Sequence, residues 1–142
     1  MTTKREIDKF IKSQQSLQFY KKTQKAFKDV LLALPHEDYR TVTNNLIVVA
    51  LHEGVLGQMM HFKNLGGKFK IVQLTIPPNI PVSALRFVIA HELGHAMQGR
   101  NWKKEDGREL EVSADKYAEK WGFKRTKNVD EYIKKYWKNP KC

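Results

Sequence analysis

Cysteine is almost absent from this chain of 142 residues, and the only one, Cys142, is the last residue. One cysteine cannot form an intramolecular disulfide, which fits a reducing compartment and leads us to expect a cytoplasmic protein. No apolar run approaches the roughly 18 residues that mark a membrane-spanning helix. The longest such run covers only 46–51. The first twenty residues also lack the apolar core and cleavage site of a secretory signal.

Acidic residues are scarce as well, because 15 Asp and Glu stand against 26 Lys and Arg, for a formal net charge of +11. A chain with this charge binds polyanions at low salt, so nucleic acid is one candidate partner. However, the basic residues are spread along the chain, and no helix-turn-helix, RNA-recognition or cysteine-finger motif accompanies them. A solvated, lysine-rich surface is therefore the simpler interpretation.

The length and the ordinary apolar share of 41% predict one globular domain over 1–142. Apolar residues at helical spacing predict a basic N-terminal helix within 1–34, with room for one break, before Pro35 ends it. Turn signals then separate three apolar strands, which we expect to form an antiparallel meander within a sheet region at 45–76. Three helices are expected to follow, at 83–98, 107–121 and 129–137. This order predicts an α+β fold.

The helix expected at 83–98 contains the most informative motif, His91-Glu92-Leu93-Gly94-His95. Residues four apart share a helix face, so His91 and His95 can bind one zinc ion. Glu92 projects about 100° away from His91, where it can reach a zinc-bound water as a general base without being a ligand. Gly94 has no side chain and lets a neighbouring element approach the helix closely. The motif thus predicts a hydrolytic zinc site, with the helices at 83–122 carrying it.

A catalytic zinc ion needs a third protein ligand and an open fourth position. The metzincin pattern would require glycine and histidine where this chain has Gln98 and Asn101, so that class is excluded. We expect the ligand on the next helix instead, where Glu111 and Asp115 are four residues apart. Glu111 would bind the metal, and Asp115 would accept a hydrogen bond from a ligand histidine. Glu109 is the rival ligand, although it can also serve in a helix cap.

The His91–His95 motif, followed by Glu111-x-x-Ala114-Asp115 and Tyr117-Ala118, resembles the gluzincin metallopeptidases. The small size is similar to the minigluzincins and to ImmA/IrrE-type peptidases. The resemblance covers about 68–122 and implies one zinc ion bound by His91, His95 and Glu111, with Glu92 as the base. The chain departs from the ImmA/IrrE type in lacking a leucine- and methionine-rich continuation. It departs from membrane-bound gluzincins in lacking spanning helices.

The sequence therefore predicts a zinc metallopeptidase that hydrolyses a protein or peptide substrate of the cytoplasm. We expect a strand at 68–76 to lie at the edge of the sheet and to bind an extended peptide by strand addition. Lys68 and Lys70 on that strand could favour an acidic substrate. Tyr117, Tyr132 and Tyr136 are candidate oxyanion donors by their chemistry alone. The alternative is a non-proteolytic module that contains zinc and binds protein or nucleic acid through its basic surface.

Overall fold

The computed structural model describes residues 1–51, 56–62, 69–98 and 107–138. The elements in chain order are α1 (Lys4–Ser13), the 3-10 helix η1 (Gln15–Phe19), α2 (Lys21–Ala33), α3 (His36–Thr43), β1 (Leu46–Leu51), β2 (Gly57–Phe62), β3 (Phe69–Thr75), α4 (Val82–Ala96), α5 (Gly107–Lys120) and α6 (Lys127–Lys138). Among the described residues, no helix is both long enough and apolar enough to cross a bilayer.

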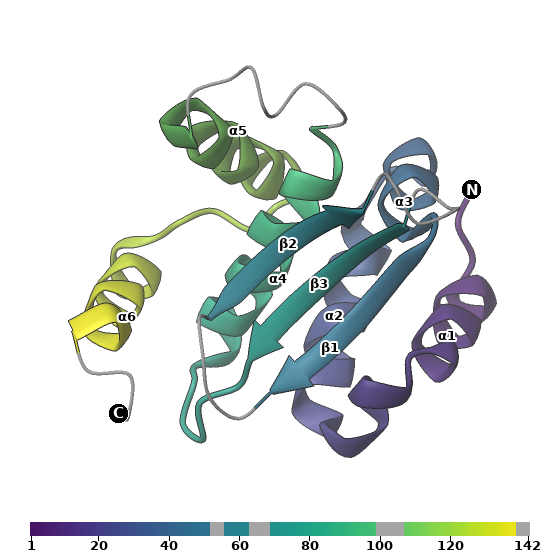
Figure 1. The fold of residues 1–142 in the computed structure, drawn as a ribbon, viewed down its shortest axis with the longest axis horizontal. Coiled ribbons are helices and arrows are strands. Elements are labelled where there is room, and N and C mark those ends of the chain that lie inside the picture. Colours follow the sequence, from purple (N-terminus) through teal and green to yellow (C-terminus); the bar gives the residue numbers. More distant parts are fainter. Residues whose placement is uncertain (52–55, 63–68, 99–106, 139–142) are drawn as a thin grey trace.

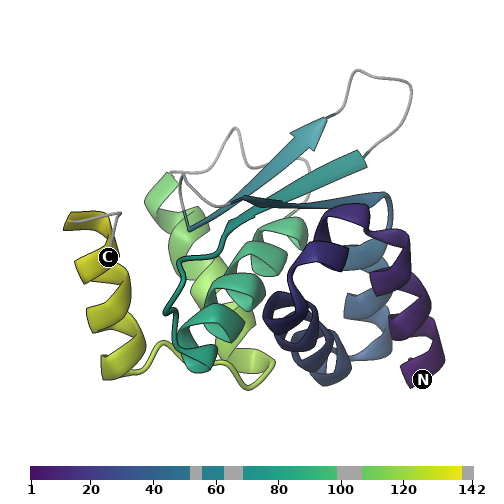
Figure 2. The ribbon, with the colours of Figure 1, turned by 90° about the horizontal axis from the view of Figure 1, so that it is seen from below.

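The fold is α+β, as the sequence predicts, with the helices on one face of a three-stranded sheet (Figures 1 and 2). The predicted antiparallel meander is wrong. The strand order is β1-β3-β2, in which β3 runs parallel to β1 and antiparallel to β2. β3 therefore lies between the two strands that precede it, and β2 forms an edge of the sheet.

The burial of the strands explains this order. Val72 and Leu74 of β3 are fully buried, and β1 alternates buried with more exposed residues. β2, whose sequence is Gly-Gln-Met-Met-His-Phe, has no fully buried residue. Pairing the two most apolar strands places both against the helices, and the more polar strand occupies the edge. A meander would instead have placed this polar strand in the centre of the sheet.

The predicted N-terminal helix is interrupted between Gln14 and Tyr20, where η1 separates α1 from α2. The interruption brings two polar side chains to the free edge of β1. Gln14 accepts a hydrogen bond from the backbone N–H of Val48 at 2.9 Å, and Ser16 accepts one from Ala50 at 2.7 Å. These side chains pair with the edge of β1 as a neighbouring strand would.

Sequence analysis assigned no element to residues 36–43, which form the short helix α3 after Pro35. Tyr39 and Val42 are its buried residues. Two buried apolar positions give too weak a periodicity to identify a helix of this length from sequence.

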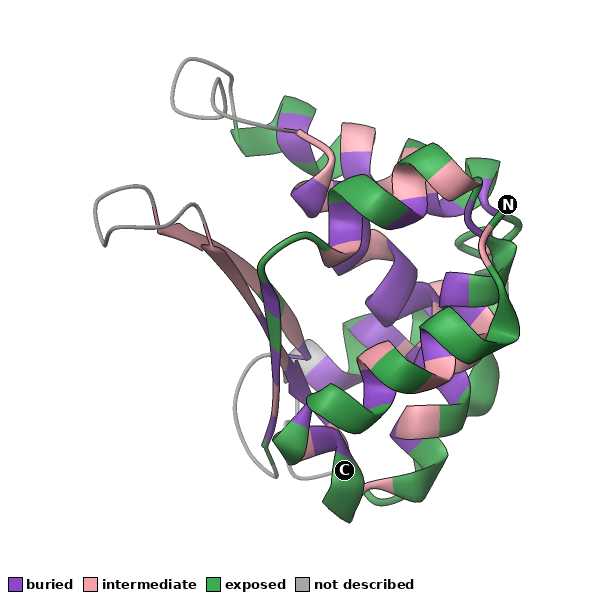
Figure 3. Cartoon of the chain, turned by 90° about the vertical axis from the view of Figure 1, so that its right-hand side faces the viewer, coloured by how far each residue is buried: buried purple, intermediate pink, exposed green. Residues whose placement is uncertain are grey.

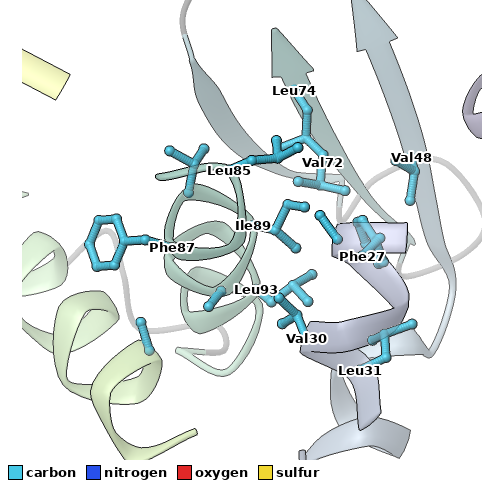
Figure 4. Packing of buried hydrophobic residues seen from close by; sticks show 14 of the residues in the cluster. Phe27, Val30, Leu31, Val48, Val72, Leu74, Leu85, Phe87, Ile89 and Leu93 are labelled. Carbon is cyan, nitrogen blue, oxygen red and sulfur yellow. The ribbon is translucent and has the colours of Figure 1, made fainter. Parts of the chain in front are cut away.

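Helix α4 lies in the centre of the helical layer, between the sheet and the helices α2, α5 and α6 (Figures 1 and 4). Leu85, Ile89 and Leu93 pack against side chains of α2 and the sheet, such as Phe27 and Val72. The buried residues concentrate where the helices face the sheet (Figure 3). Since α4 is apolar around most of its circumference, its surroundings fix its position. The histidine motif thus lies on the helix that has the most buried residues among those the structure describes.

Candidate metal centre

Helices α4 and α5 approach each other closely at Gly94. A Cβ atom placed on Gly94 would lie 2.9 Å from the backbone oxygen of Ala114 and 3.1 Å from its Cα. Ala114 and Ala118 are fully buried at the same contact. The prediction that Gly94 lets a neighbouring element approach this helix closely is confirmed, and that element is α5. Their close contact brings the acidic residues of α5 beside the histidines of α4.

Three predicted ligand side chains converge at this contact. The Nε2 atom of His91 lies 2.9 Å from Oε2 of Glu111, and the Nε2 atom of His95 lies 3.3 Å from Oε1. These separations are those of hydrogen bonds between the rings and the carboxylate, and they leave the three donor atoms near the roughly 3.3 Å spacing of ligand atoms that lie about 2.0–2.1 Å from a tetrahedral zinc ion. The ring planes of His91 and His95 are nearly perpendicular, at 88°. The donor set of two imidazoles and one carboxylate is typical of catalytic zinc.

A polar partner holds the second ring nitrogen of each histidine. The Nδ1 atom of His91 lies 2.7 Å from Oδ1 of Asp115. The Nδ1 atom of His95 lies 2.8 Å from Oε1 of Gln98, whose amide donates to the backbone oxygen of Leu110 at 2.7 Å. With Nδ1 occupied in this way, both rings present Nε2 toward Glu111. Such contacts fix the tautomer and orientation of a metal-binding histidine.

Glu92 is buried beside these ligands, with only 6% of its surface exposed. His91, Glu92 and His95 each offer a donor atom within 4.8 Å of the others. Burial raises the pKa of Glu92, although the charges of the two histidines partly oppose this effect. A carboxylate held out of water is a stronger base than one on the surface, which suits Glu92 to accepting a proton.

The charges at the site are strongly coupled. Burial disfavours the protonated form of His91, but hydrogen bonds to Asp115 and Glu111 outweigh this and raise its pKa to about 9. The pKa of His95 is also raised, because hydrogen bonds to Glu111 and Gln98 outweigh its burial. Hydrogen bonds from the two histidines lower the pKa of Glu111. The carboxylate of Glu111 thus lies within hydrogen-bonding distance of both imidazole rings in the metal-free site.

Two cavities, of about 580 and 440 Å³, lie on either side of this cluster. Both are lined by Gly57 and Gln58 of β2 and by Glu92 and Glu111. The larger continues along β2 to Phe62 and past His95, and the smaller continues toward Phe87, Arg125 and Ile133. The cluster therefore lies in the middle of an open groove that has β2 as one wall.

The strand beside the site is not the one that sequence analysis chose. We expected an edge strand at 68–76, but β3 is the central strand and β2 is the edge. Lys70 does not face the groove, because its Nζ atom donates to the backbone oxygen of Thr41 at 2.6 Å. Lys68 lies outside the described residues. Lys70 therefore gives no support for an acidic substrate.

The rival ligand Glu109 is exposed in the first turn of α5, and Glu111 rather than Glu109 lines the groove. The residue before Gly107, which would complete the helix cap expected for Glu109, lies outside the described residues. None of the three candidate tyrosines lines either cavity. Tyr117 packs on Trp121, and Tyr136 is a core residue with 4% exposure.

Sequence analysis missed three residues of the site. Gln98 was considered only as a departure from the metzincin pattern, although its place three residues after His95 puts it on the same helix face. Arg125 lies between Asp115 and Asp130, with Nη1 3.7 Å from the first and Nε 2.8 Å from the second. Gly57 contacts Glu92 from β2, and no sequence signal pointed to that contact.

Comparison of the chain with protein-family models, curated protein sequences and solved structures gives no significant match.

Proposed function

We propose that the protein is a zinc-dependent peptidase of the gluzincin type, with one zinc ion held by His91, His95 and Glu111. The observation that carries this proposal is the convergence of both Nε2 atoms on one carboxylate, at 2.9 and 3.3 Å. The ligands come from two helices in close contact and are oriented by Asp115 and Gln98. A purely structural zinc site would have no use for a buried glutamate next to its ligands, which favours hydrolysis over the binding-module alternative.

Glu92 is the general base in this proposal. When bound, zinc lowers the pKa of a water molecule and polarises a carbonyl oxygen. The Glu92 carboxylate accepts a proton from the attacking water and passes it to the nitrogen of the leaving amine. Its burial supports the first of these steps, because a carboxylate with a raised pKa takes up a proton more readily.

The substrate is an extended stretch of protein or peptide that pairs with β2. Within the described part of the chain, β2 pairs only with β3, so its other edge is available for strand addition. At the opposite edge of the sheet, Gln14 and Ser16 already bond to the backbone of β1. A peptide on β2 would run along the groove and past Glu92 and Glu111. We keep the cytoplasm as the proposed location on the basis of the single cysteine.

The test compares the purified protein with its Glu92→Gln variant, which has nearly the same shape but lacks the base. Both proteins should bind about one zinc ion per chain. The unchanged protein should cleave unstructured protein substrates, and the variant should be slower by about 10²–10⁴-fold. Equal cleavage by both would contradict the role of Glu92. Zinc binding without any cleavage would instead favour the non-proteolytic module.

A further inference from the structure

We propose that Gly57 is a positioning residue for Glu92, and that its missing side chain provides the space in which the carboxylate lies. A Cβ atom on Gly57 would lie 2.6 Å from Cγ of Glu92, 2.8 Å from Oε1 and 2.9 Å from Cδ. These separations are shorter than any van der Waals contact between such atoms. Even the smallest side chain at position 57 would therefore displace the carboxyl group of Glu92.

The backbone does not explain why this residue is glycine. Among the described glycines only Gly122 has a positive φ, of 95°, so the conformation at Gly57 is open to other residues. Glycine also weakens a strand, and it often marks a place where another group approaches closely. At Gly57 that group is Glu92. The close approach of Glu92, and not a turn or a bulge, thus explains why residue 57 is glycine.

Gly57 and Gly94 differ in the atoms that an added side chain would meet. A side chain at Gly94 would meet the backbone of Ala114, which cannot move without parting two helices. The three atoms nearest to a side chain at Gly57 would all belong to the side chain of Glu92, from Cγ to Oε1, and none of them to the backbone. Both cavities are lined by Glu92, so a displaced carboxylate has space to enter. Substitution at Gly57 should therefore move the base and leave the fold intact.

The effect of Gly57 on turnover rests on the proposed peptidase activity, whereas its contact with Glu92 does not. Proton transfer requires the base to be within hydrogen-bonding reach of the attacking water. A displacement of about 1 Å at a reacting group can cost about 10²-fold in rate. Gly57→Ala should thus reduce kcat by about 10- to 100-fold, with KM changed far less.

Gly107→Ala is the matched control. Gly107 lines the larger cavity, yet a Cβ atom there would meet nothing within 4 Å. This variant should bind zinc and melt at the same temperature as the unchanged protein does, whereas Gly57→Ala should bind zinc, melt at a lower temperature and have a kcat about 10- to 100-fold lower. Equal activity of the Gly57→Ala variant and the unchanged protein would overturn the proposal.

A double-mutant cycle shows whether Gly57 acts through Glu92. In a Glu92→Gln background the base is already missing, so adding Gly57→Ala should slow the residual cleavage no further. If Gly57→Ala reduced kcat by the same factor in both backgrounds, it would be acting on something other than the base. That result would contradict the positioning role.

A second cycle needs no enzymatic activity and remains informative if the protein is not a peptidase. Gly57→Ala should lower Tm by about 4 °C or more in the unchanged protein, because it overpacks the site. In a Glu92→Ala background the clash is gone, and the same substitution should leave Tm unchanged or raise it. An equal loss of Tm in both backgrounds would overturn the assigned contact. Absence of cleavage by the unchanged protein would count only against the proposed function.

Discussion

The Nδ1 atom of His91 lies 2.7 Å from Oδ1 of Asp115, while the Nε2 atom of the same ring lies 2.9 Å from Oε2 of Glu111. Two acids one turn apart on α5 thus hold both nitrogens of one imidazole on α4. The far oxygen of Asp115 faces Arg125 at 3.7 Å, which restrains the carboxylate in turn. The orientation of His91 is therefore set by α5 and not by its own helix alone.

Replacing His91 or His95 with alanine should greatly weaken zinc binding, because each substitution removes one of the three proposed protein ligands. The unchanged protein should gain thermal stability when zinc is added, and each variant should gain much less, since binding free energy adds to folding free energy. Elemental analysis and melting curves with and without zinc measure both effects. His36→Ala is the control, because His36 contacts Thr2 away from the site. A protein that takes up no zinc at all would contradict the proposed metal centre.

Asp115→Asn should weaken zinc binding or turnover by about 10- to 100-fold, less than the loss of a ligand. The asparagine keeps the size of the side chain but removes the negative charge that stabilises the proton on Nδ1 of His91. A competitive chelator titration gives the affinity. Glu109→Ala should have no effect, because Glu109 lines neither cavity, whereas Glu111 lines both. If Glu109→Ala lost zinc and Asp115→Asn did not, the assignment of Glu111 as ligand would be wrong.

Gln98→Leu should produce a loss of similar size at the other histidine. The substitution removes both the acceptor for His95 Nδ1 and the donor to the backbone of Leu110, and thus the link through which α5 supports His95 by way of Gln98. Gln98→Glu is the informative partner variant, since a carboxylate still accepts from His95 but cannot donate to Leu110. Chelator titration should rank the unchanged protein first, Gln98→Glu second and Gln98→Leu last. Equal affinity of all three would show that His95 needs no such support.

The site residues that could be predicted are those that lie close together in the sequence and therefore share a helix face. The spacing of His91 and His95, and of Glu111 and Asp115, defines helix faces, and the gap between the two pairs allows antiparallel helices. The small residues Gly94 and Ala114 indicated which faces meet. All of these signals depend on the helical repeat, which is the strongest pattern a single sequence carries.

The strand order could not be predicted, because it depends on which strands exclude water best and not on their order in the chain. A turn signal after 46–51 suggested a hairpin, yet β3 pairs with β1 and leaves β2 at the edge. The contact of Gly57 with Glu92 follows from that order and was invisible for the same reason. The position of β2 along the groove is therefore the part of the site that could be seen only in the structure.

Stability of the metal-free protein should depend on pH through the same ligands. The raised pKa of His91, about 9 when folded, means that its contribution is complete below about pH 6.5 and is lost as the pH rises through 9. The lowered pKa of Glu111 means that its contribution is present above about pH 4.5 and is lost as the pH falls. Denaturant titrations in chelator should thus find this contribution largest between about pH 4.5 and 6.5.

Glu111→Gln is the control for that pH dependence, because it removes the carboxylate that both rings face. The variant should be less stable than the unchanged metal-free protein near pH 6, and the difference should shrink toward pH 9 as the histidines lose their protons. A difference that stayed constant from pH 6 to 9 would show that the histidines do not titrate against Glu111.

Gln14 should contribute to folding through the edge of β1, far from the metal centre. Its side chain accepts from the N–H of Val48 at 2.9 Å and donates to the backbone oxygen of Leu46 at 3.2 Å, and all three residues are buried. Gln14→Ala leaves these two backbone groups without that partner and should reduce the free energy of unfolding by about 1–3 kcal/mol. Gln15→Ala, at an exposed neighbouring position, should change it by less than about 0.5 kcal/mol. Denaturant unfolding measures both, and amide hydrogen exchange at Val48 should accelerate only in Gln14→Ala. Equal stability of the two variants would mean that water replaces the glutamine without cost, and that the β1 edge is as open to an added strand as the β2 edge.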